Sequence, residues 1–280
     1  IYVGSLKMFL KIRRAISPRL YREKSQGNWQ YPFLAIGWRL AEFFTRSRPV
    51  SVDGVSLTIP CENWITHFRW YLFKTKETEV RHFIDTYLKP NETLFDVGAN
   101  IGVFSVYAAK RGLRVFSFEP EYSNLALLKK NILRNRVHAN IQTYCVGISD
   151  FVGLSKLHLQ STLGGAAAHT ESTSAIQSTS EGFAVVFSEG IVTATLDYLC
   201  ENLGVVPNGL KIDTDGNEPK ILSGAPKLLK NPVLKSIIIE IPSDPDKKRF
   251  CEDILIQNGF HCDWSAQSSK NQIWVRIKNI

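Results

Sequence analysis

The 280-residue sequence predicts an α/β protein whose core is a parallel sheet covered by helices on both faces. From Thr93 onward, short apolar runs alternate with segments of helical periodicity, which is typical of strand–helix–strand units. These runs are nearly continuous in apolar residues, as expected for strands buried on both faces. The length accommodates one large α/β domain with an extension, or two small domains.

Two elements precede this pattern. The segment VSVDGVSLTIP alternates apolar and polar residues around Asp53-Gly54, which predicts a β-hairpin. A helix is expected over residues 77–92, closed by Pro90. Strands are then expected at TLFDVG, RVFSFEP, IQTYCVGISD, GLKIDTDG, LKSIIIEI and NQIWVRI, and helices at VFSVYAAKRG, NLALLKKNILRN, TLDYLCENLG, EPKILSGAPKLLKN and KKRFCEDILIQNGF. Residues 161–183, rich in Ser, Thr, Gly and Ala, are expected to form a long flexible loop.

The basic character of the chain is confined to its first fifty residues. The formal charge is +8, and residues 1–50 hold ten Lys or Arg against two Asp or Glu, whereas the remainder is balanced. Residues 1–48 therefore predict a basic helical extension that contacts an anionic membrane surface or a partner, or that forms a helical cap with a solvated face. Because no run reaches 18 apolar residues, we expect no membrane span and a cytoplasmic protein, at most peripheral to the membrane.

The five cysteines show no CxxC spacing, and the histidines show no HxxxH pairing. We expect buried free thiols and no zinc site.

The stretch LFDVGANIGVFS places Asp96 at the end of an apolar run, directly before a glycine turn. Ligands of parallel α/β sheets bind at the carboxyl ends of the strands, so this turn is expected in a binding site. A dinucleotide site would require GxGxxG, and the Asp96 carboxylate would repel the pyrophosphate of a dinucleotide. A cationic ligand such as S-adenosylmethionine is compatible with this carboxylate. Glu119 ends the next strand and is placed for ribose hydroxyls. Asp150 ends a third strand and is placed for the adenine amine.

The motifs FDVGANIG, VFSFEP, ISDFVG, TATLDYL, LKIDTDGNEPKILSGA and IIIEI, in this order, resemble those of FkbM-type S-adenosylmethionine-dependent methyltransferases. The resemblance covers about residues 50–280 and implies a methyltransferase domain over residues 49–280. It implies a Rossmann-like sheet of seven strands whose last strand is antiparallel. The implied cofactor-binding residues are Asp96, Gly98, Ala99, Asn100 and Gly102 at the methionine end, Glu119 and Pro120 at the ribose, and Asp150 near adenine.

A second group of polar residues lies in GLKIDTDGNE. Lys211 and Asp213 are expected at the end of a central strand facing the same crevice as the cofactor. Methyl transfer to oxygen requires a group that removes the hydroxyl proton, and Asp213 is the first candidate, with Glu240 second. The further candidates, Asp215, Glu218 and His169, are expected near the substrate. Asp215 and Asn217 are alternatively helix caps before Pro219. Asp213 and Asp215, with Glu218 or Glu240, are alternatively oxygen ligands of a divalent cation.

The leading hypothesis is an O-methyltransferase that uses S-adenosylmethionine and acts on a hydroxyl of a glycan, glycolipid or secondary metabolite. A nucleic-acid methyltransferase is an alternative motivated by the basic extension. It is disfavoured by the balanced charge of the remaining chain and by the absence of an N/D-P-P-Y/F motif. A scaffold that has lost catalysis and binds a membrane or partner through residues 1–48 is the second alternative.

Overall fold

The computed structural model describes residues 37, 40, 41, 47–167, 169–172, 185–266 and 269–277. The chain divides into two compact units, residues 1–46 and 47–280. Gly37, Leu40 and Ala41, the described positions of the first unit, are helical. The rest of the predicted basic extension before Ser47, and with it the membrane contact, lies outside the described residues.

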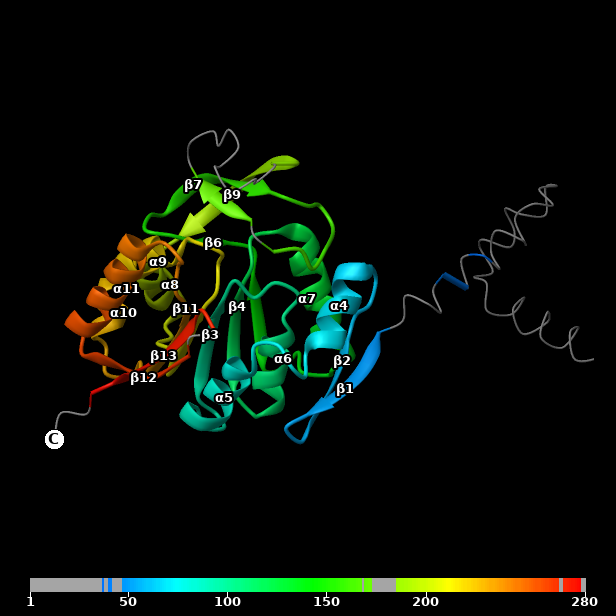
Figure 1. The fold of residues 1–280 in the computed structure, drawn as a ribbon, viewed down its shortest axis with the longest axis horizontal. Helices are drawn as coiled ribbons and strands as arrows, with labels where there is room; N and C mark the ends of the chain where they lie inside the picture. The colour runs from blue at the N-terminus through cyan, green and yellow to red at the C-terminus, as the bar shows by residue number, and fades with distance from the viewer. Residues whose placement is uncertain are drawn as a thin grey trace, which may run out of the picture. The chain divides into compact units, whose positions relative to one another are not determined.

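A seven-stranded sheet forms the centre of the second unit (Figure 1). In spatial order its strands are β12 (Phe260–Ser265), β13 (Asn271–Arg276), β11 (Ser236–Glu240), β10 (Gly209–Ile212), β3 (Thr93–Val97), β4 (Arg114–Phe118) and β5 (Ile141–Tyr144). The strands from β11 to β5 pair in parallel, whereas β13 pairs antiparallel with both β11 and β12. The predicted mixed sheet with an antiparallel last strand is therefore confirmed, and β12 is an additional strand that the sequence pattern did not indicate.

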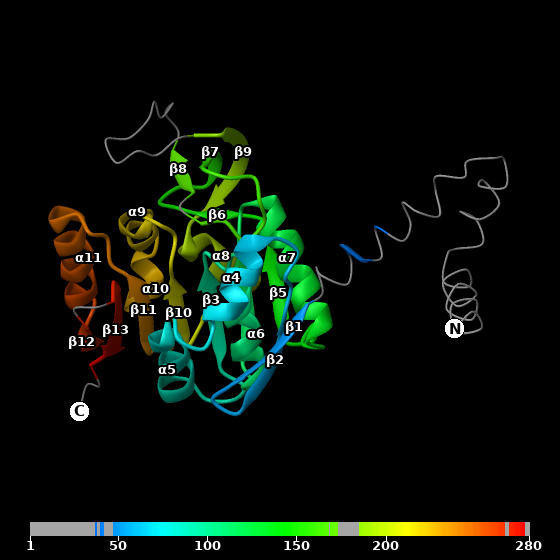
Figure 2. The ribbon, with the colours of Figure 1, turned by 45° about the vertical axis from the view of Figure 1, so that its right-hand side comes forward.

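Helices cover both faces of this sheet (Figure 2). One face packs against α5 (Thr78–Tyr87), α6 (Val103–Lys110), α7 (Tyr122–Arg134) and the hairpin of β1 (Arg48–Val52) and β2 (Val55–Ile59). The other packs against α8 (Leu196–Leu203), α9 (Glu218–Ser223), α10 (Pro226–Lys230) and α11 (Pro245–Gln257). Leu94 and Phe95 belong to different core clusters because successive side chains of a strand point to opposite faces.

Local sequence chemistry explains where several elements begin and end. Asp53 and Gly54 have φ of 51° and 76°, as a two-residue hairpin turn requires, which confirms the predicted hairpin. The helix predicted over residues 218–231 is divided into α9 and α10. A Cβ on Gly224 would lie 2.4 Å from the carbonyl oxygen of Ser149, and Pro226 starts the second helix. Tight packing at Gly224 and the missing N–H of Pro226 account for the break.

A second sheet of four strands lies over the carboxyl ends of the parallel strands (Figure 1). Its order is β6 (Gly147–Ile148), β9 (Phe187–Ala194), β7 (Gly153–Leu159) and β8 (Thr170–Ser172). The predicted strand IQTYCVGISD is thus divided between two sheets, with β5 in the first and β6 in the second. Part of the loop expected over residues 161–183 is strand β8, and residues 173–183 lie outside the described residues.

No helix in the described part of the chain is long and apolar enough to cross a bilayer. The prediction of buried thiols holds for Cys61 and Cys251, whereas Cys145 and Cys262 are exposed.

Candidate active site

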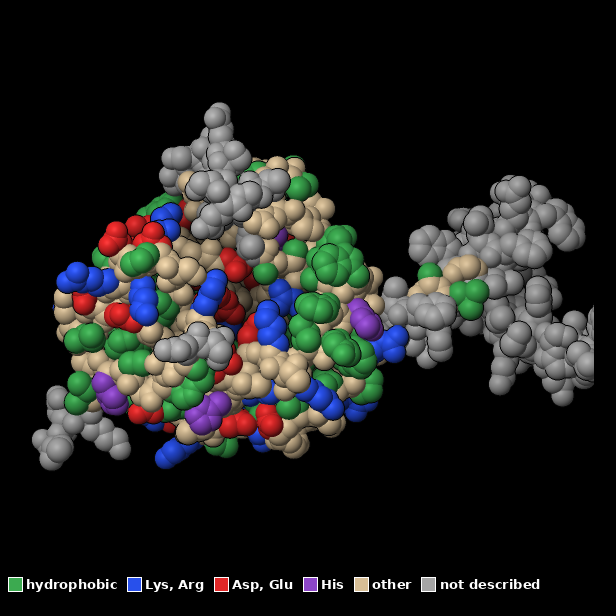
Figure 3. Space-filling model, viewed as in Figure 1, with side chains coloured by type: hydrophobic (Ala, Val, Ile, Leu, Met, Phe, Trp, Pro, Cys, Tyr) green, Lys and Arg blue, Asp and Glu red, His purple; other side chains and the backbone are tan. Residues whose placement is uncertain are grey.

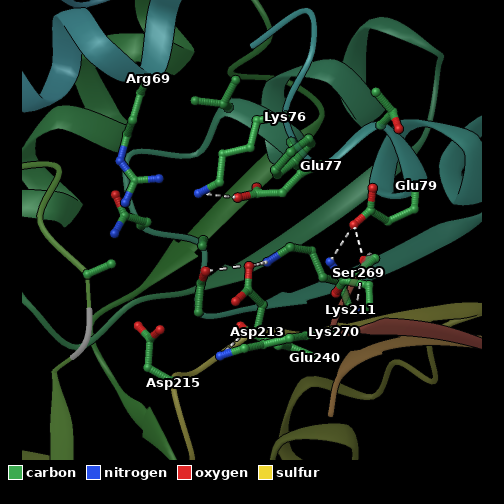
Figure 4. A pocket seen from close by; sticks show the side chains of 18 of the residues that line it. Arg69, Lys76, Glu77, Glu79, Lys211, Asp213, Asp215, Glu240, Ser269 and Lys270 are labelled. Atoms are coloured by element: carbon green, nitrogen blue, oxygen red, sulfur yellow. Dashed lines mark hydrogen bonds and ion pairs between the residues drawn. The ribbon is translucent and has the colours of Figure 1, made fainter. Parts of the chain in front are cut away.

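Two neighbouring cavities lie at the carboxyl ends of the central strands. The larger of the two, about 570 Å³, opens at the ends of β3, β10 and β11. Acidic and basic side chains line the hollow on this face of the molecule (Figure 3). Its lining includes Gly98, Ala99, Asn100, Lys211, Asp213, Asp215 and Glu240. Arg69 and Lys76 lie on the opposite side of this cavity from Asp213 and Glu240 (Figure 4). The cavity therefore joins the predicted cofactor loop to the predicted catalytic carboxylates.

The smaller cavity lies between the ends of β3 and β4 and the four-stranded sheet. Glu119 and Pro120 line it from β4, and Ile148, Leu157 and Ile191 line it from the second sheet. It shares the residues Gly98, Asn100, Ala167, Asp213 and Asp215 with the larger cavity. The two cavities are therefore neighbouring compartments of one cleft.

The loop after β3 requires glycine at two positions. Gly98 has φ +74°, and a Cβ on it would lie 1.9 Å from the carbonyl oxygen of Asp213. Gly102 also has φ +74°, and its Cβ would lie 1.8 Å from a methyl carbon of Leu128. Only glycine combines this backbone conformation with such close packing, so Gly98 brings the loop against the end of β10. Gly102 packs the loop onto α7 and lines neither cavity.

Asp96 and Lys211 form a buried ion pair beneath the larger cavity. The register of β3 and β10 places the two residues side by side, and Lys211 Nζ lies 3.1 Å from Asp96 Oδ1. Ser105 Oγ donates a hydrogen bond of 2.5 Å to the other carboxylate oxygen. Burial opposes the charge of Lys211, but Asp96 and Asp213 raise the pKa of its ammonium above the usual value. Asp96 is 1% exposed and lines neither cavity, so its contacts in this structure are with Lys211 and Ser105, and its contact with the cofactor stays a prediction.

Asp213 and Glu240 form a hydrogen-bonded carboxyl pair at the ends of β10 and β11. Burial opposes ionisation of Asp213, but Lys211 Nζ at 3.3 Å and the hydrogen bond with Glu240 lower the pKa of Asp213. Burial, this hydrogen bond and the charge of Asp213 raise the pKa of Glu240 to about 8. At neutral pH the pair therefore holds one proton on Glu240, which leaves Asp213 as an ionised proton acceptor facing the cavity.

Glu119 is a buried carboxyl at the end of β4. Its two oxygens accept the backbone N–H groups of Asn100, at 2.8 Å, and of Glu121, at 3.0 Å. Burial raises the pKa of Glu119 to about 7, although these hydrogen bonds oppose the shift. Glu119 is therefore held at the junction of the glycine loop and the smaller cavity. A ligand that donates hydrogen bonds to this carboxyl would stabilise its ionised form.

We expect Glu119→Gln to change the pH dependence of stability. The folded-state pKa of about 7 lies above the ordinary value of 4.5, so the folded protein retains this proton longer than the unfolded chain does. The carboxyl therefore costs stability progressively as pH rises from about 4.5 to about 7. Between pH 5 and pH 8, the wild type should lose about 2–3 kcal/mol of unfolding free energy relative to the variant. Urea denaturation at both pH values measures this difference, and parallel pH profiles for the two proteins would refute it.

Residues 164–166, within the predicted flexible loop, are held over the cleft by side chains of three other segments. Their carbonyl groups accept hydrogen bonds from Asn63 at 2.8 Å, Arg69 at 2.7 Å and Asn100 at 2.7 Å. Asn124 accepts from the N–H of residue 165 at 2.7 Å. These contacts hold the chain so that Ala166 lines the smaller cavity and Ala167 lines both.

His169 follows this segment and lines the smaller cavity. Its ring nitrogens are buried and have no hydrogen-bond partner among the described residues. Burial lowers the pKa of His169, so the imidazole is neutral at neutral pH. The structure thus places His169 in the cavity that Glu119 and Asp213 also line, whereas Glu240 lines only the larger cavity.

Two further predicted site residues lie outside the cleft. Asp150 is exposed beyond β6 and accepts from Ser149 Oγ at 3.2 Å, because the chain leaves the main sheet after Tyr144. Glu218 turns inward and accepts from the N–H groups of Thr214 and Gly216, which makes it the cap of this turn. Neither residue lines the two cavities, so the assignments of Asp150 to adenine and of Glu218 to the substrate gain no support from this structure and stay predictions.

The side chains of the alternative cation site are not grouped around one point. Glu218 Oε1 accepts from the N–H and hydroxyl of Thr214 and from the N–H of Gly216, and no three His, Cys, Asp or Glu side chains within the described residues are grouped to hold a metal ion. Asn217, the alternative cap, donates instead to the carbonyl of Ile148 at 2.7 Å and so fastens this turn to the second sheet.

Sequence reasoning missed α4 (Trp64–Leu72), which supplies Arg69 to the cleft. A signal for it was present: Asn63 and Thr66 form a reciprocal capping box at its N-terminus. It also missed Glu171 on β8, which lines the smaller cavity and accepts from Lys220 Nζ at 2.9 Å. No local pattern marks Glu171, because its position depends on the pairing of β8 with β7.

Comparison with known proteins decides the family. A profile of the FkbM methyltransferase domain matches residues 96–262, which is more than half of the chain. The chain belongs to the FkbM methyltransferase family. This membership confirms the resemblance seen in the motifs, and it confirms S-adenosylmethionine as the predicted cofactor.

Individual relatives of this FkbM-family chain are more distant. The 31-O-demethyl-FK506 methyltransferase FkbM of Streptomyces tacrolimicus is 35% identical over 85 residues, which cover 30% of this chain and 31% of the relative. The match thus spans about a third of the length of that relative. Among solved structures, magnesium protoporphyrin IX methyltransferase of Synechocystis PCC 6803 matches with a TM-score of 0.45 and 13% identity, covering 77% of this chain and 85% of the other. Precorrin-6y C5,15-methyltransferase of Geobacter metallireducens GS-15 matches with a TM-score of 0.43 and 12% identity, covering 72% and 88%.

Proposed function

We propose that this FkbM-family chain transfers the methyl group of S-adenosylmethionine to a hydroxyl oxygen of a glycan, glycolipid or other secondary metabolite. The observation that carries the proposal is the carboxyl group of Asp213, 3.3 Å from Lys211 Nζ, in the same cavity as the glycine loop after β3. A proton acceptor beside the cofactor loop is what transfer to a hydroxyl requires. The curated relative is named for methylation of an O-demethyl compound, which also supports oxygen as the acceptor atom.

The residues of the cleft fit S-adenosylmethionine. Glu119 would accept hydrogen bonds from the ribose hydroxyls, because each of its oxygens accepts only one backbone N–H. Ile148, Leu157 and Ile191 form apolar walls suited to adenine. The carboxylates of Asp213 and Asp215 would face the cationic methionine end. Once bound, the cofactor supplies an electrophilic methyl group on its sulfonium.

The chain itself contributes orientation and proton transfer. Asp213 would accept the hydroxyl proton of the acceptor, which makes the oxygen nucleophilic as it meets the methyl group in line. Glu240, protonated at neutral pH, donates to Asp213 and fixes the direction of its free oxygen. Lys211 acts as a positioning residue, since its ammonium keeps Asp213 ionised and is itself held by Asp96.

Transfer of labelled methyl tests the proposed reaction. The full chain is incubated with methyl-labelled S-adenosylmethionine and with separate glycan, lipid and small-metabolite extracts, and the product bond is tested with alkali. We expect label in an alkali-stable methyl ether with the wild type and none above background with Asp213→Asn. Label found only in alkali-labile esters would refute methylation of a hydroxyl. Label found in added RNA or DNA would instead establish the nucleic-acid alternative.

A further inference from the structure

Helix α4 exposes an aromatic face beside the cleft. Trp64, Phe68 and Tyr71, spaced by four and three residues, are 71%, 53% and 68% exposed. This spacing places them on one side of the helix. Apolar side chains gather over α4 next to the charged hollow (Figure 3). Single exposed apolar residues are normal, but an aromatic row beside a cavity indicates a binding surface.

A groove of about 410 Å³, here called the α4 groove, runs along this helix. Trp64, Ile65, Phe68 and Leu72 line it from α4, and Phe104 lines it from α6. Its polar side chains are Gln160 and Ser161, together with Arg69, Lys76 and Glu77, which also line the larger cavity. Such a surface offers few hydrogen-bond partners for the hydroxyl groups of a sugar but accommodates hydrocarbon well.

The α4 groove is continuous with the larger cavity. Both are lined by Arg69, Lys76, Glu77, Val103, Phe104 and Ala167. One molecule lying across this border would place a polar part near Asp213 and an apolar part against α4. The charged residues at the border separate the two environments.

We infer that the methyl acceptor is an amphiphile whose hydroxyl-bearing part enters the larger cavity and whose hydrocarbon part occupies the α4 groove. This inference rests on the proposed function and narrows it, because it favours a glycolipid or an apolar metabolite over an unmodified glycan. Burial of the hydrocarbon part supplies the affinity, and the cavity orients the hydroxyl.

Matched alkyl glucosides test the inference with the full chain. Octyl β-D-glucoside below its micelle concentration and methyl β-D-glucoside are each titrated calorimetrically into protein saturated with S-adenosylhomocysteine. We expect octyl glucoside to bind and methyl glucoside to show no binding. The double variant Trp64→Ala/Phe68→Ala should weaken octyl glucoside binding about tenfold or more, as expected from the loss of two apolar contacts. Its affinity for S-adenosylhomocysteine should equal that of the wild type, which shows that the site remains folded.

Tyr122→Ala is the matched control, since Tyr122 is a 73% exposed aromatic residue on α7 that lines neither cavity nor the α4 groove. It should bind octyl glucoside as the wild type does. Equal binding of both glucosides, or equal effects of the α4 and Tyr122 variants, would overturn the inference. The inference would also be overturned if the protein did not bind octyl glucoside but bound lipid vesicles, or associated with itself, through α4. If S-adenosylhomocysteine itself fails to bind, the proposed function fails, which is a distinguishable result.

Discussion

Asp213→Asn is expected to lower the rate of methyl transfer by about 10²–10⁴-fold, the range for loss of a positioned general base. The amide keeps the shape of the side chain but cannot accept the hydroxyl proton. The variant should retain measurable binding of S-adenosylhomocysteine, because Glu119, Asp215 and the apolar walls of the smaller cavity remain. Single-turnover transfer of labelled methyl to the extract fraction that the wild type labels would measure the rate.

Glu240→Gln is the comparison that distinguishes the two carboxyls. At pH 7 Glu240 is protonated, so a glutamine should preserve its hydrogen bond to Asp213 and most of the rate. In the wild type, the rate should decline above about pH 8, where Glu240 ionises and no longer donates to Asp213. The variant should lack this decline. A Glu240→Gln variant as inactive as Asp213→Asn at pH 7 would contradict the role of Glu240 as a hydrogen-bond donor to Asp213 only. An inactive Glu240→Gln beside an active Asp213→Asn would make Glu240 the base.

Lys211→Met is expected to reduce the unfolding free energy by about 3–5 kcal/mol, because it leaves a buried carboxylate without its counter-charge. Asp96 is 1% exposed, and Lys211 is 3.1 Å from it. Denaturant unfolding measures the loss, and Asp96→Asn combined with Lys211→Met should restore part of it.

Lys235→Met provides the surface control for this substitution. Lys235 pairs with Glu92, but its side chain is 52% exposed, so its loss should cost at most about 1 kcal/mol. Similar losses for Lys211→Met and Lys235→Met would show that the Lys211–Asp96 pair is not a buried charge network.

The sequence predicted the fold well because every strand of the main sheet except β12 carries its own signal. The apolar run before Asp96 and the glycine turn after it specify a buried strand, a tight loop and a helix within a dozen residues. The loop residues Gly98 to Asn100, together with Glu119, Asp213 and Glu240, accordingly lie in one cleft.

The remaining positions depend on contacts between distant segments. The sequence predicts that the Asp96 carboxylate faces a ligand. In the structure, Lys211 on the neighbouring strand, far along the chain, forms an ion pair with Asp96 and balances its charge. Asp150 follows an apolar run that is split between two sheets, and no feature of that run marks the split. The role of Arg69 depends on residues 164–166 crossing above α4, a contact that local pattern does not specify.

Calorimetric titration of S-adenosylhomocysteine into the full chain tests the central claim most directly, with Glu119→Gln and Asp150→Asn measured beside it. We predict micromolar binding to the wild type and to Asp150→Asn. Glu119→Gln should bind about tenfold or more weakly, because a charge-assisted hydrogen bond to the ribose is lost. No binding to folded wild-type protein, or loss of binding in Asp150→Asn with none in Glu119→Gln, would contradict the assignment of the cleft as the cofactor site.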